Sequence, residues 1–246
     1  DVLKGAGAWR FAQGRLSLSD VTFRLEDREL DDRFQPLVSN GASLVLASNR
    51  ITAQATMLEP QSQRAVVRAD IKHDLGSGIG QADLTMDELL FDRKLQPDTI
   101  SRLILGVVAN AEGKVRGTGR IDWNPEGTSS SGRFTTDALD FAAAFGPVKG
   151  VSGTVEFTDL LSLVTAPDQH LTIASVNPGI EVNDGKLRFE LRPGNVLAVL
   201  GAEWPFLDGT LTMEPTQMQL GVAETRRYTF RIAGLDAAKF VERMDM

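Results

Sequence analysis

The sequence contains no cysteine and only two histidines, His73 and His170, among its 246 residues. Disulfide bonds, thiol catalysis and cysteine-ligated zinc or iron–sulfur centres are therefore excluded. Basic residues are also in the minority, with 26 Lys and Arg against 33 Asp and Glu and a net charge of −7. This balance argues against nucleic acid as a partner, because proteins that bind phosphate backbones carry a basic patch.

Long hydrophobic runs are missing as well. The longest, residues 103–109, is far shorter than the roughly 20 residues that a membrane-spanning helix needs. The sequence begins at Asp1, and no basic stretch followed by an apolar stretch marks a leader peptide. We therefore expect a soluble piece of a longer protein.

The motifs of common enzymes are absent too. The sequence has no G-x-S-x-G elbow, no Walker A loop and no H-E-x-x-H pair. Nothing singles out two of the 33 acidic residues as a glycosidase pair. We therefore expect no enzymatic activity, no metal ion and no cofactor.

What the sequence does have is alternation of apolar and polar residues, with Gly, Asn or Asp between the runs, which is typical of β-strands. Leu16 and Leu18, then Val21 and Phe23, alternate with polar residues, and the shift between the two pairs predicts a β-bulge. The same alternation recurs at residues 51–57, 121–123, 155–157, 171–173, 187–191, 211–213, 218–220 and 228–232.

Turns and helices are predicted from separate signals. Residues 183–185 (Asn-Asp-Gly) and 208–209 (Asp-Gly) stand between alternating runs and predict tight hairpins. Apolar residues at i, i+3, i+4, i+7 and i+8 predict a helix near 98–109. Weaker patterns favour short helices at 138–145 and 236–244. These signals predict a mainly β fold of consecutive antiparallel strands with two or three short helices.

Few helices leave the dry side of such a sheet uncovered. About ten strands, about 4.8 Å apart and about 17 Å long, present a face on the order of 800 Å². A helix of twelve residues shields roughly 180 Å² of it. The unshielded half represents on the order of 30 kcal/mol of hydrophobic burial, as an upper estimate. A second half of the sheet, giving a sandwich or barrel, or a bound apolar ligand in a curved trough must cover it.

Four ordered stretches in the C-terminal part carry a family resemblance, at residues 146–160 (GPVKGVSGTVEFTDL), 163–171 (LVTAPDQHL), 176–191 (VNPGIEVNDGKLRFEL) and 202–215 (AEWPFLDGTLTMEP). Together they resemble the YdbH-like family of AsmA-type envelope proteins, whose domain also bears the label "dicarboxylate transport". Residues from about 97 to 243 carry this resemblance. We therefore divide the chain into a β-groove segment, 1–96, and the YdbH-like segment, 97–246, within one continuous domain.

The resemblance implies a curved, twisted antiparallel sheet that forms a groove for phospholipid acyl chains. It implies a periplasmic segment of a protein that is anchored in the inner membrane of a Gram-negative bacterium and carries phospholipid toward the outer membrane. It also implies strand addition by a small outer-membrane lipoprotein of the YnbE type. Membrane contact would then lie outside this segment.

The alternating C-terminal runs supply the residues that would line such a groove or, in a closed core, fill it. The predicted lining residues are Leu187, Phe189, Leu191, Leu211, Met213, Tyr228, Phe230 and Ile232.

Two other functions compete with lipid transport. The same strands closed into a β-sandwich would make a binding or structural module of the cell envelope. A dicarboxylate transporter would need convergent arginines, and Arg226 and Arg227, adjacent on an alternating strand, would point to opposite faces.

Overall fold

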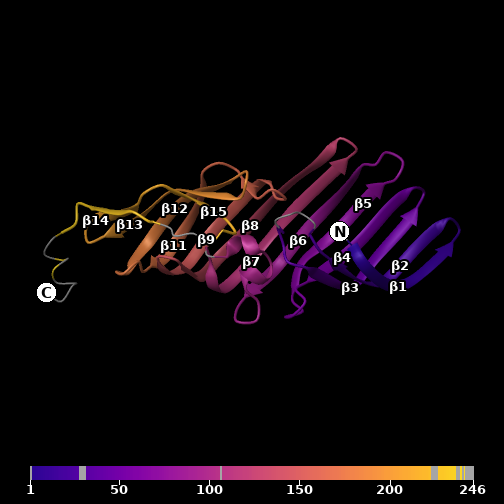
Figure 1. Ribbon diagram of the computed structural model, residues 1–246, viewed down its shortest axis with the longest axis horizontal. Helices are drawn as coiled ribbons and strands as arrows, with labels where there is room; N and C mark the ends of the chain where they lie inside the picture. Colours follow the sequence, from indigo (N-terminus) through magenta and orange to yellow (C-terminus); the bar gives the residue numbers. More distant parts are fainter. Residues whose placement is uncertain are drawn as a thin grey trace.

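In a computed structural model that describes residues 2–27, 32–105, 107–222, 227–236, 239 and 241, all the strands belong to one antiparallel sheet. The strands follow one another along the long axis of the molecule (Figure 1). They are β1 (Val2–Ala12), β2 (Arg15–Leu25), β3 (Leu37–Ala47), β4 (Arg50–Leu58), β5 (Ala65–Asp74), β6 (Gly80–Phe91), β7 (Ala109–Asn124), β8 (Gly127–Ala143), β9 (Gly146–Asp159), β10 (Val164–Thr165), β11 (Gln169–Val176), β12 (Val182–Arg192), β13 (Val196–Phe206), β14 (Gly209–Met213), β15 (Thr216–Gln219) and β16 (Phe230–Ala233).

The order of the strands in the sheet is almost their order in the chain. It runs from β1 to β9, then through β11, β12, β13 and β14 to β16. β10 pairs with β9, and β15 pairs with β13 beside β14. Among the described residues the first and last strands do not pair, so the sheet is not closed into a barrel. The prediction of a mainly β, curved antiparallel sheet is confirmed.

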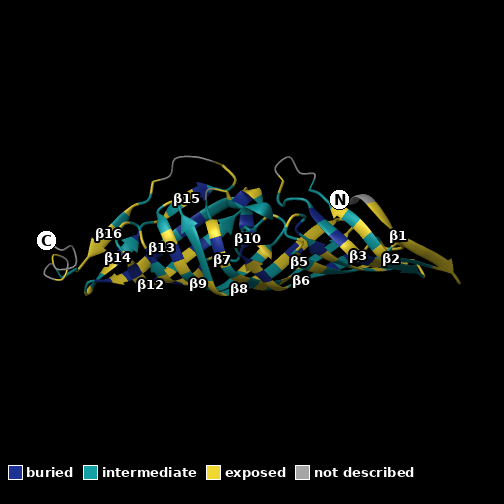
Figure 2. Cartoon of the chain, turned by 90° about the horizontal axis from the view of Figure 1, so that it is seen from below, coloured by how far each residue is buried: buried dark blue, intermediate teal, exposed yellow. Residues whose placement is uncertain are grey.

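Successive residues of a strand face opposite sides of a sheet, and the register sorts the chain into an apolar face and a polar face. Figure 2 shows the resulting alternation of buried and exposed residues along the strands. One row of cross-strand neighbours on the apolar face is Trp9, Leu18, Leu44, Ala53, Ile71, Ala82 and Ile121. The adjacent row on the polar face is Arg10, Ser17, Val45, Thr52, Lys72, Gln81 and Asp122.

The C-terminal strands keep the same division. Their row on the apolar face is Leu171, Leu187, Ala202, Met213 and Phe230. The row beside it on the polar face is Thr172, Lys186, Glu203, Thr212 and Arg231. One continuous sheet thus carries an apolar side along its length.

Two buried clusters lie on the apolar face. The first gathers where β3 to β7 begin or end, and it contains Leu37, Met57, Val66, Leu89, Phe91, Leu95 and Ala111. The second extends from β9 to β14, and it contains Val148, Val151, Ile173, Val176, Val182, Val199, Ala202, Trp204, Phe206, Leu211 and Met213. Leu139 and Phe141 of β8 pack against both clusters and so join them.

The helix expected near 98–109 is wrong. The segment forms two short 3-10 helices, η1 (Pro97–Thr99) and η2 (Arg102–Ile104), and β7 begins at Ala109. Between them Ser101 is extended, with φ −144° and ψ 127°, and its hydroxyl donates a hydrogen bond to the carbonyl oxygen of Arg33 at 2.6 Å. The extended backbone of Ser101, which also contacts a distant segment, interrupts the helix at this point.

Other local predictions have mixed outcomes. The bulge in β2 is confirmed, because its register with β3 shifts between Leu18 and Val21. The hairpin at 208–209 is confirmed as well, since it joins β13 to β14. Residues 138–145 are not helical but mostly belong to β8, and residues 183–185 lie within β12 rather than in a turn. The expected helix over 236–244 falls largely outside the described residues.

Candidate functional site

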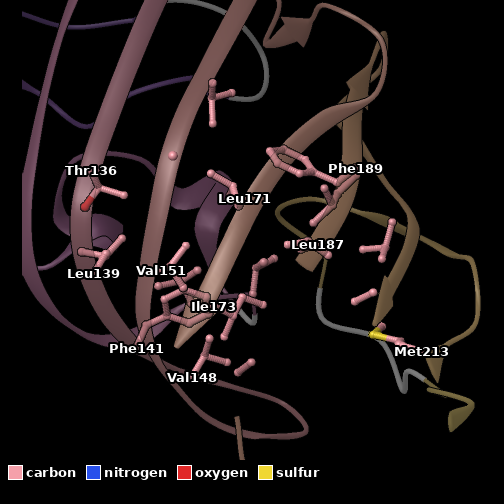
Figure 3. Close-up of a pocket in the computed structure, with 18 of the residues that line it drawn as sticks. Thr136, Leu139, Phe141, Val148, Val151, Leu171, Ile173, Leu187, Phe189 and Met213 are labelled. Atoms are coloured by element: carbon pink, nitrogen blue, oxygen red, sulfur yellow. The ribbon is translucent and has the colours of Figure 1, made fainter. Parts of the chain in front are cut away.

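A hollow of about 340 Å³ lies on the apolar face. Its floor is made by β7, β8, β9, β11, β12 and β13. In Figure 3 the labelled side chains of β8, β9, β11 and β12 are directed into one space. The lining residues are Val107, Val108, Val115, Phe134, Thr135, Thr136, Leu139, Phe141, Ala143, Phe145, Val148, Val151, Gly153, Val155, Leu171, Ile173, Leu187, Phe189, Leu197, Val199, Ala202, Trp204, Met213, Met218 and Tyr228.

The lining is almost wholly apolar, and none of the described residues that form it is charged. The hydroxyls of Thr135 and Thr136 are occupied, the first with Thr154 Oγ1 at 2.8 Å and the second with the carbonyl oxygen of Lys114 at 2.8 Å. A hollow of this size falls within the range of roughly 300–1,000 Å³ that is common for small-molecule sites. It suits hydrocarbon, because it has no partner to offer a charged ligand.

The structure brings together half of the predicted lining residues. Leu187, Phe189, Met213 and Tyr228 line the hollow. The other four lie elsewhere: Leu191 is half-buried at the end of β12, Leu211 is buried in the second cluster, Phe230 packs against that cluster, and Ile232 is exposed on β16.

Most of the floor comes from β8 and β9, which the alternation of the C-terminal runs did not identify. Among the six lining residues of β8, Phe134, Thr136, Leu139 and Phe141 follow one another at spacings of two, three and two. The register of β8 with β9 shifts between Thr136 and Leu139. A bulge inserts one residue there and makes a strand look helical in sequence.

Part of the wall of the hollow comes from the segment between β6 and β7, which we call the strap (residues 92–105, 107 and 108). Val107 and Val108 of the strap belong to the lining. The base of the strap is fixed by the side-chain amide of Gln96, which donates to the carbonyl oxygens of Asp92 and Ala111 at 2.7 and 2.9 Å and accepts from the N–H of Ala111 at 2.8 Å. The base of the strap is therefore fixed to the sheet.

Further contacts hold the strap against the first half of the sheet. The guanidinium of Arg64 donates to both carboxylate oxygens of Asp92, at 2.9 and 2.6 Å, and these hydrogen bonds lower the pKa of Asp92 to about 2. The N–H of Gln35 donates to the carbonyl oxygen of Ile100 at 2.6 Å, next to the bond between Ser101 and Arg33.

The polar face carries the charges that the hollow lacks. Arg120 reaches Asp83 and Asp122 at 3.2 and 2.8 Å, and its hydrogen bond lowers the pKa of the Asp122 carboxyl. Arg188 pairs in the same way with Asp168 at 2.8 Å and lowers the pKa of that carboxyl. Within each pair the arginine and aspartate charges neutralise each other. Exposed ion pairs of this kind contribute little to the stability of the fold.

Two other classes of site were sought in the described part of the chain. It contains no group of three or more side chains that could hold a metal ion. No helix within that part has the length and hydrophobicity needed to cross a bilayer. Of the two arginines considered for a dicarboxylate, Arg226 lies outside the described residues and Arg227 is exposed.

The single sheet with an apolar hollow agrees with a match to a known protein family. The model of the YdbH-like family, described as intermembrane phospholipid transport protein YdbH, matches residues 2–246. The chain belongs to the YdbH-like family. This is a family of proteins that transport phospholipid between membranes, and it is not a family of enzymes. The match therefore also covers residues 2–96, which precede the part of the chain, about 97–243, that carries the sequence resemblance.

Comparison with curated proteins and with solved structures gave no match. The site is therefore interpreted from the family and from the geometry of the hollow.

Proposed function

We propose that this chain is a periplasmic segment of an inner-membrane-anchored protein that conducts phospholipid toward the outer membrane. In this proposal the acyl chains occupy the hollow, and the headgroup stays in water at its margin. The observation that carries it is an uncharged hollow on one face of a sheet whose other face holds the ion pairs.

The energetics favour an acyl chain as the occupant. Each methylene transferred from water gains about 0.8 kcal/mol, so about ten methylenes in the hollow contribute about 8 kcal/mol before the costs of ordering the chain. A charged headgroup in the same place would lose its hydration with no partner in the wall, at several kcal/mol. The apolar acyl chain of a phospholipid therefore suits the hollow, and its charged headgroup suits the water at the margin of the hollow.

A partner that adds a strand fits the sheet edges. Among the described strands, β1 and β16 each pair on one side only, which leaves backbone donors and acceptors available. We propose that a small lipoprotein of the YnbE type at the outer membrane extends one of these edges.

The proposed function is tested by transfer of a phospholipid with a fluorescent acyl chain from donor to acceptor vesicles. Leu171 and Leu187 are cross-strand neighbours in the floor. Leu171→Asp or Leu187→Asp should reduce lipid bound and transferred at least about tenfold, because burying a carboxylate costs more than the roughly 1.4 kcal/mol that a factor of ten requires.

The matched control is Thr172→Asp, which places the same charge one residue away, on the polar face and opposite Lys186. This control should transfer lipid as the unchanged chain does. Equal transfer by all of these variants would reject the hollow as the lipid site.

A further inference from the structure

One hydrogen bond closes the strap over the hollow. The N–H of Gly221, two residues after β15, donates to the carbonyl oxygen of Leu103 in η2 at 3.1 Å. We call this bond the clasp. In the antiparallel order β15 runs opposite to β6, so the strap leaves one end of the sheet and Gly221 comes from the other. The floor strands β7 to β13 lie between them, so the clasp passes over the floor.

The clasp lies at the margin of the hollow. Val107 and Val108, just after η2, and Met218, three residues before Gly221, all belong to the lining. The two chain segments that meet at the clasp thus both supply part of the wall.

The two sides of the clasp are held very differently. The strap is fixed to the first half of the sheet by Arg64 with Asp92, by Gln96 with Ala111 and by Ser101 with Arg33. Across the clasp there is one backbone hydrogen bond between described residues, and its donor is an exposed glycine with φ +75°. Fluctuations that open the contacts around one exposed glycine are more frequent than those that break all the contacts of the base.

A closed clasp obstructs a phospholipid that moves along the groove. The chain of such a lipid would travel over the apolar floor, with its headgroup at the open side. At the clasp the headgroup would meet the strap, and the space that the described residues leave beneath it is the uncharged hollow. The headgroup can pass in water only when the strap and Gly221 separate.

We infer that the Leu103–Gly221 clasp is a gate: the contact between Gly221 and the strap opens to let the headgroup pass and closes over the acyl chain afterwards. This inference rests on the proposed function. It adds that passage past this point of the groove is controlled by the chain itself.

The absence of cysteine from the sequence makes a direct test possible. An ideal Cβ on Gly221 lies 3.7 Å from Leu103 Cα and 3.2 Å from Leu103 Cδ2. With a Cα–Cβ bond of about 1.5 Å at position 221, the two Cα atoms lie at most about 5.2 Å apart, within the roughly 4.4–6.8 Å that disulfides span. The double variant Leu103→Cys/Gly221→Cys is loaded with a phospholipid that bears a fluorescent acyl chain, and then oxidised or kept reduced. Release into phosphatidylglycerol–phosphatidylethanolamine vesicles is then followed.

Oxidation should slow release at least about tenfold, and reduction should restore it. The single variants Leu103→Cys and Gly221→Cys should not respond to oxidation. Equal release from the oxidised and reduced double variant would overturn the gate alone. Failure of the unchanged chain to load any lipid would overturn the proposed function, and the gate with it.

A second variant covers the case in which the double variant fails to fold. Gly221→Ala places a methyl group against Leu103 at a positive φ, which should weaken the clasp and speed release severalfold. Its control is Gly14→Ala, which has a similar φ of +71° and open space around it in a distant turn. Release that is unchanged in Gly221→Ala, or equally changed in Gly14→Ala, would overturn the gate.

Discussion

The indole ring of Trp204 lies against the backbone of Gly185 on the neighbouring strand. A methyl group at position 185 would come within 2.1 Å of Trp204 Nε1, and no such distance is tolerated between non-bonded atoms. Trp204 is 2% exposed and forms part of the wall of the hollow. The shape of the site in β12 and β13 therefore depends on the absence of a side chain at one position.

Gly185→Ala should lower the free energy of unfolding by about 1–3 kcal/mol, because Trp204 has to leave its position in a packed wall. Urea denaturation measures this loss. Gly127→Ala is the control, since a Cβ there meets nothing within 4 Å. If the Gly185→Ala variant were as stable as the unchanged chain, Trp204 would not rest on Gly185 in solution.

Ser39→Ala should stabilise the protein. Ser39 is 1% exposed, and its hydroxyl has no hydrogen-bond partner among the described residues. Since burying an unpaired hydroxyl is unfavourable, its removal should raise the free energy of unfolding by about 1 kcal/mol. A shift of the urea midpoint to lower concentration would contradict the interpretation that the Ser39 hydroxyl is buried without a partner.

Asp92→Asn should destabilise the strap in a pH-dependent manner. Hydrogen bonds from Arg64 hold the pKa of Asp92 near 2, below its ordinary 3.8. A carboxyl with a lowered pKa stabilises the fold fully above its unfolded pKa, and this contribution is lost as the pH falls from 3.8 toward 2. The variant should therefore be less stable at neutral pH and should approach the unchanged chain near pH 2. A constant difference across this range would rule out the ion pair as the cause.

Gln96→Met should loosen the base of the strap. The side chain keeps its length, but three hydrogen bonds to the backbone of Asp92 and Ala111 are lost. We expect a loss of about 1–3 kcal/mol, since backbone groups near the buried Ala111 lose their partners. Hydrogen exchange of the Ala111 amide should accelerate accordingly. Gln61→Met, at an exposed position, is the control, and equal exchange in both variants would contradict the role of Gln96.

Much of the fold could be predicted from alternation alone. The strand pattern around Leu187 and Leu211 reports directly which side of the sheet is dry, because the period of a strand is fixed by its geometry. The bulge between Leu18 and Val21 could be predicted for the same reason, since a one-residue shift reverses the faces.

The two wrong helices have different physical origins. At 138–145 the bulge next to Leu139 changes the apolar spacing of β8 from two to three, which imitates a helix. At 97–109 the apolar spacing is real, but it serves contacts to distant segments. Ser101 bonds to Arg33, and Leu103 meets Gly221. Long-range partners of this kind leave no local signal in one sequence.

The site shows the same limit. Phe189 and Met213 could be identified because they alternate on regular strands. Val107 and Val108 could not, since their place in the wall depends on how the strap folds back over β7 and β8. The alternation thus predicts that the site is an apolar face of the sheet. It does not predict where the hollow ends, because the strap forms part of its wall.

The central claim is that hydrocarbon occupies the hollow. Native mass spectrometry of the chain, purified without detergent from the periplasm of a Gram-negative host, tests it most directly. We expect added masses of whole phospholipids, which Leu171→Asp should lack and Thr172→Asp should retain. A chain that carries no lipid as purified and takes none up from phospholipid vesicles, while remaining folded, would contradict the account.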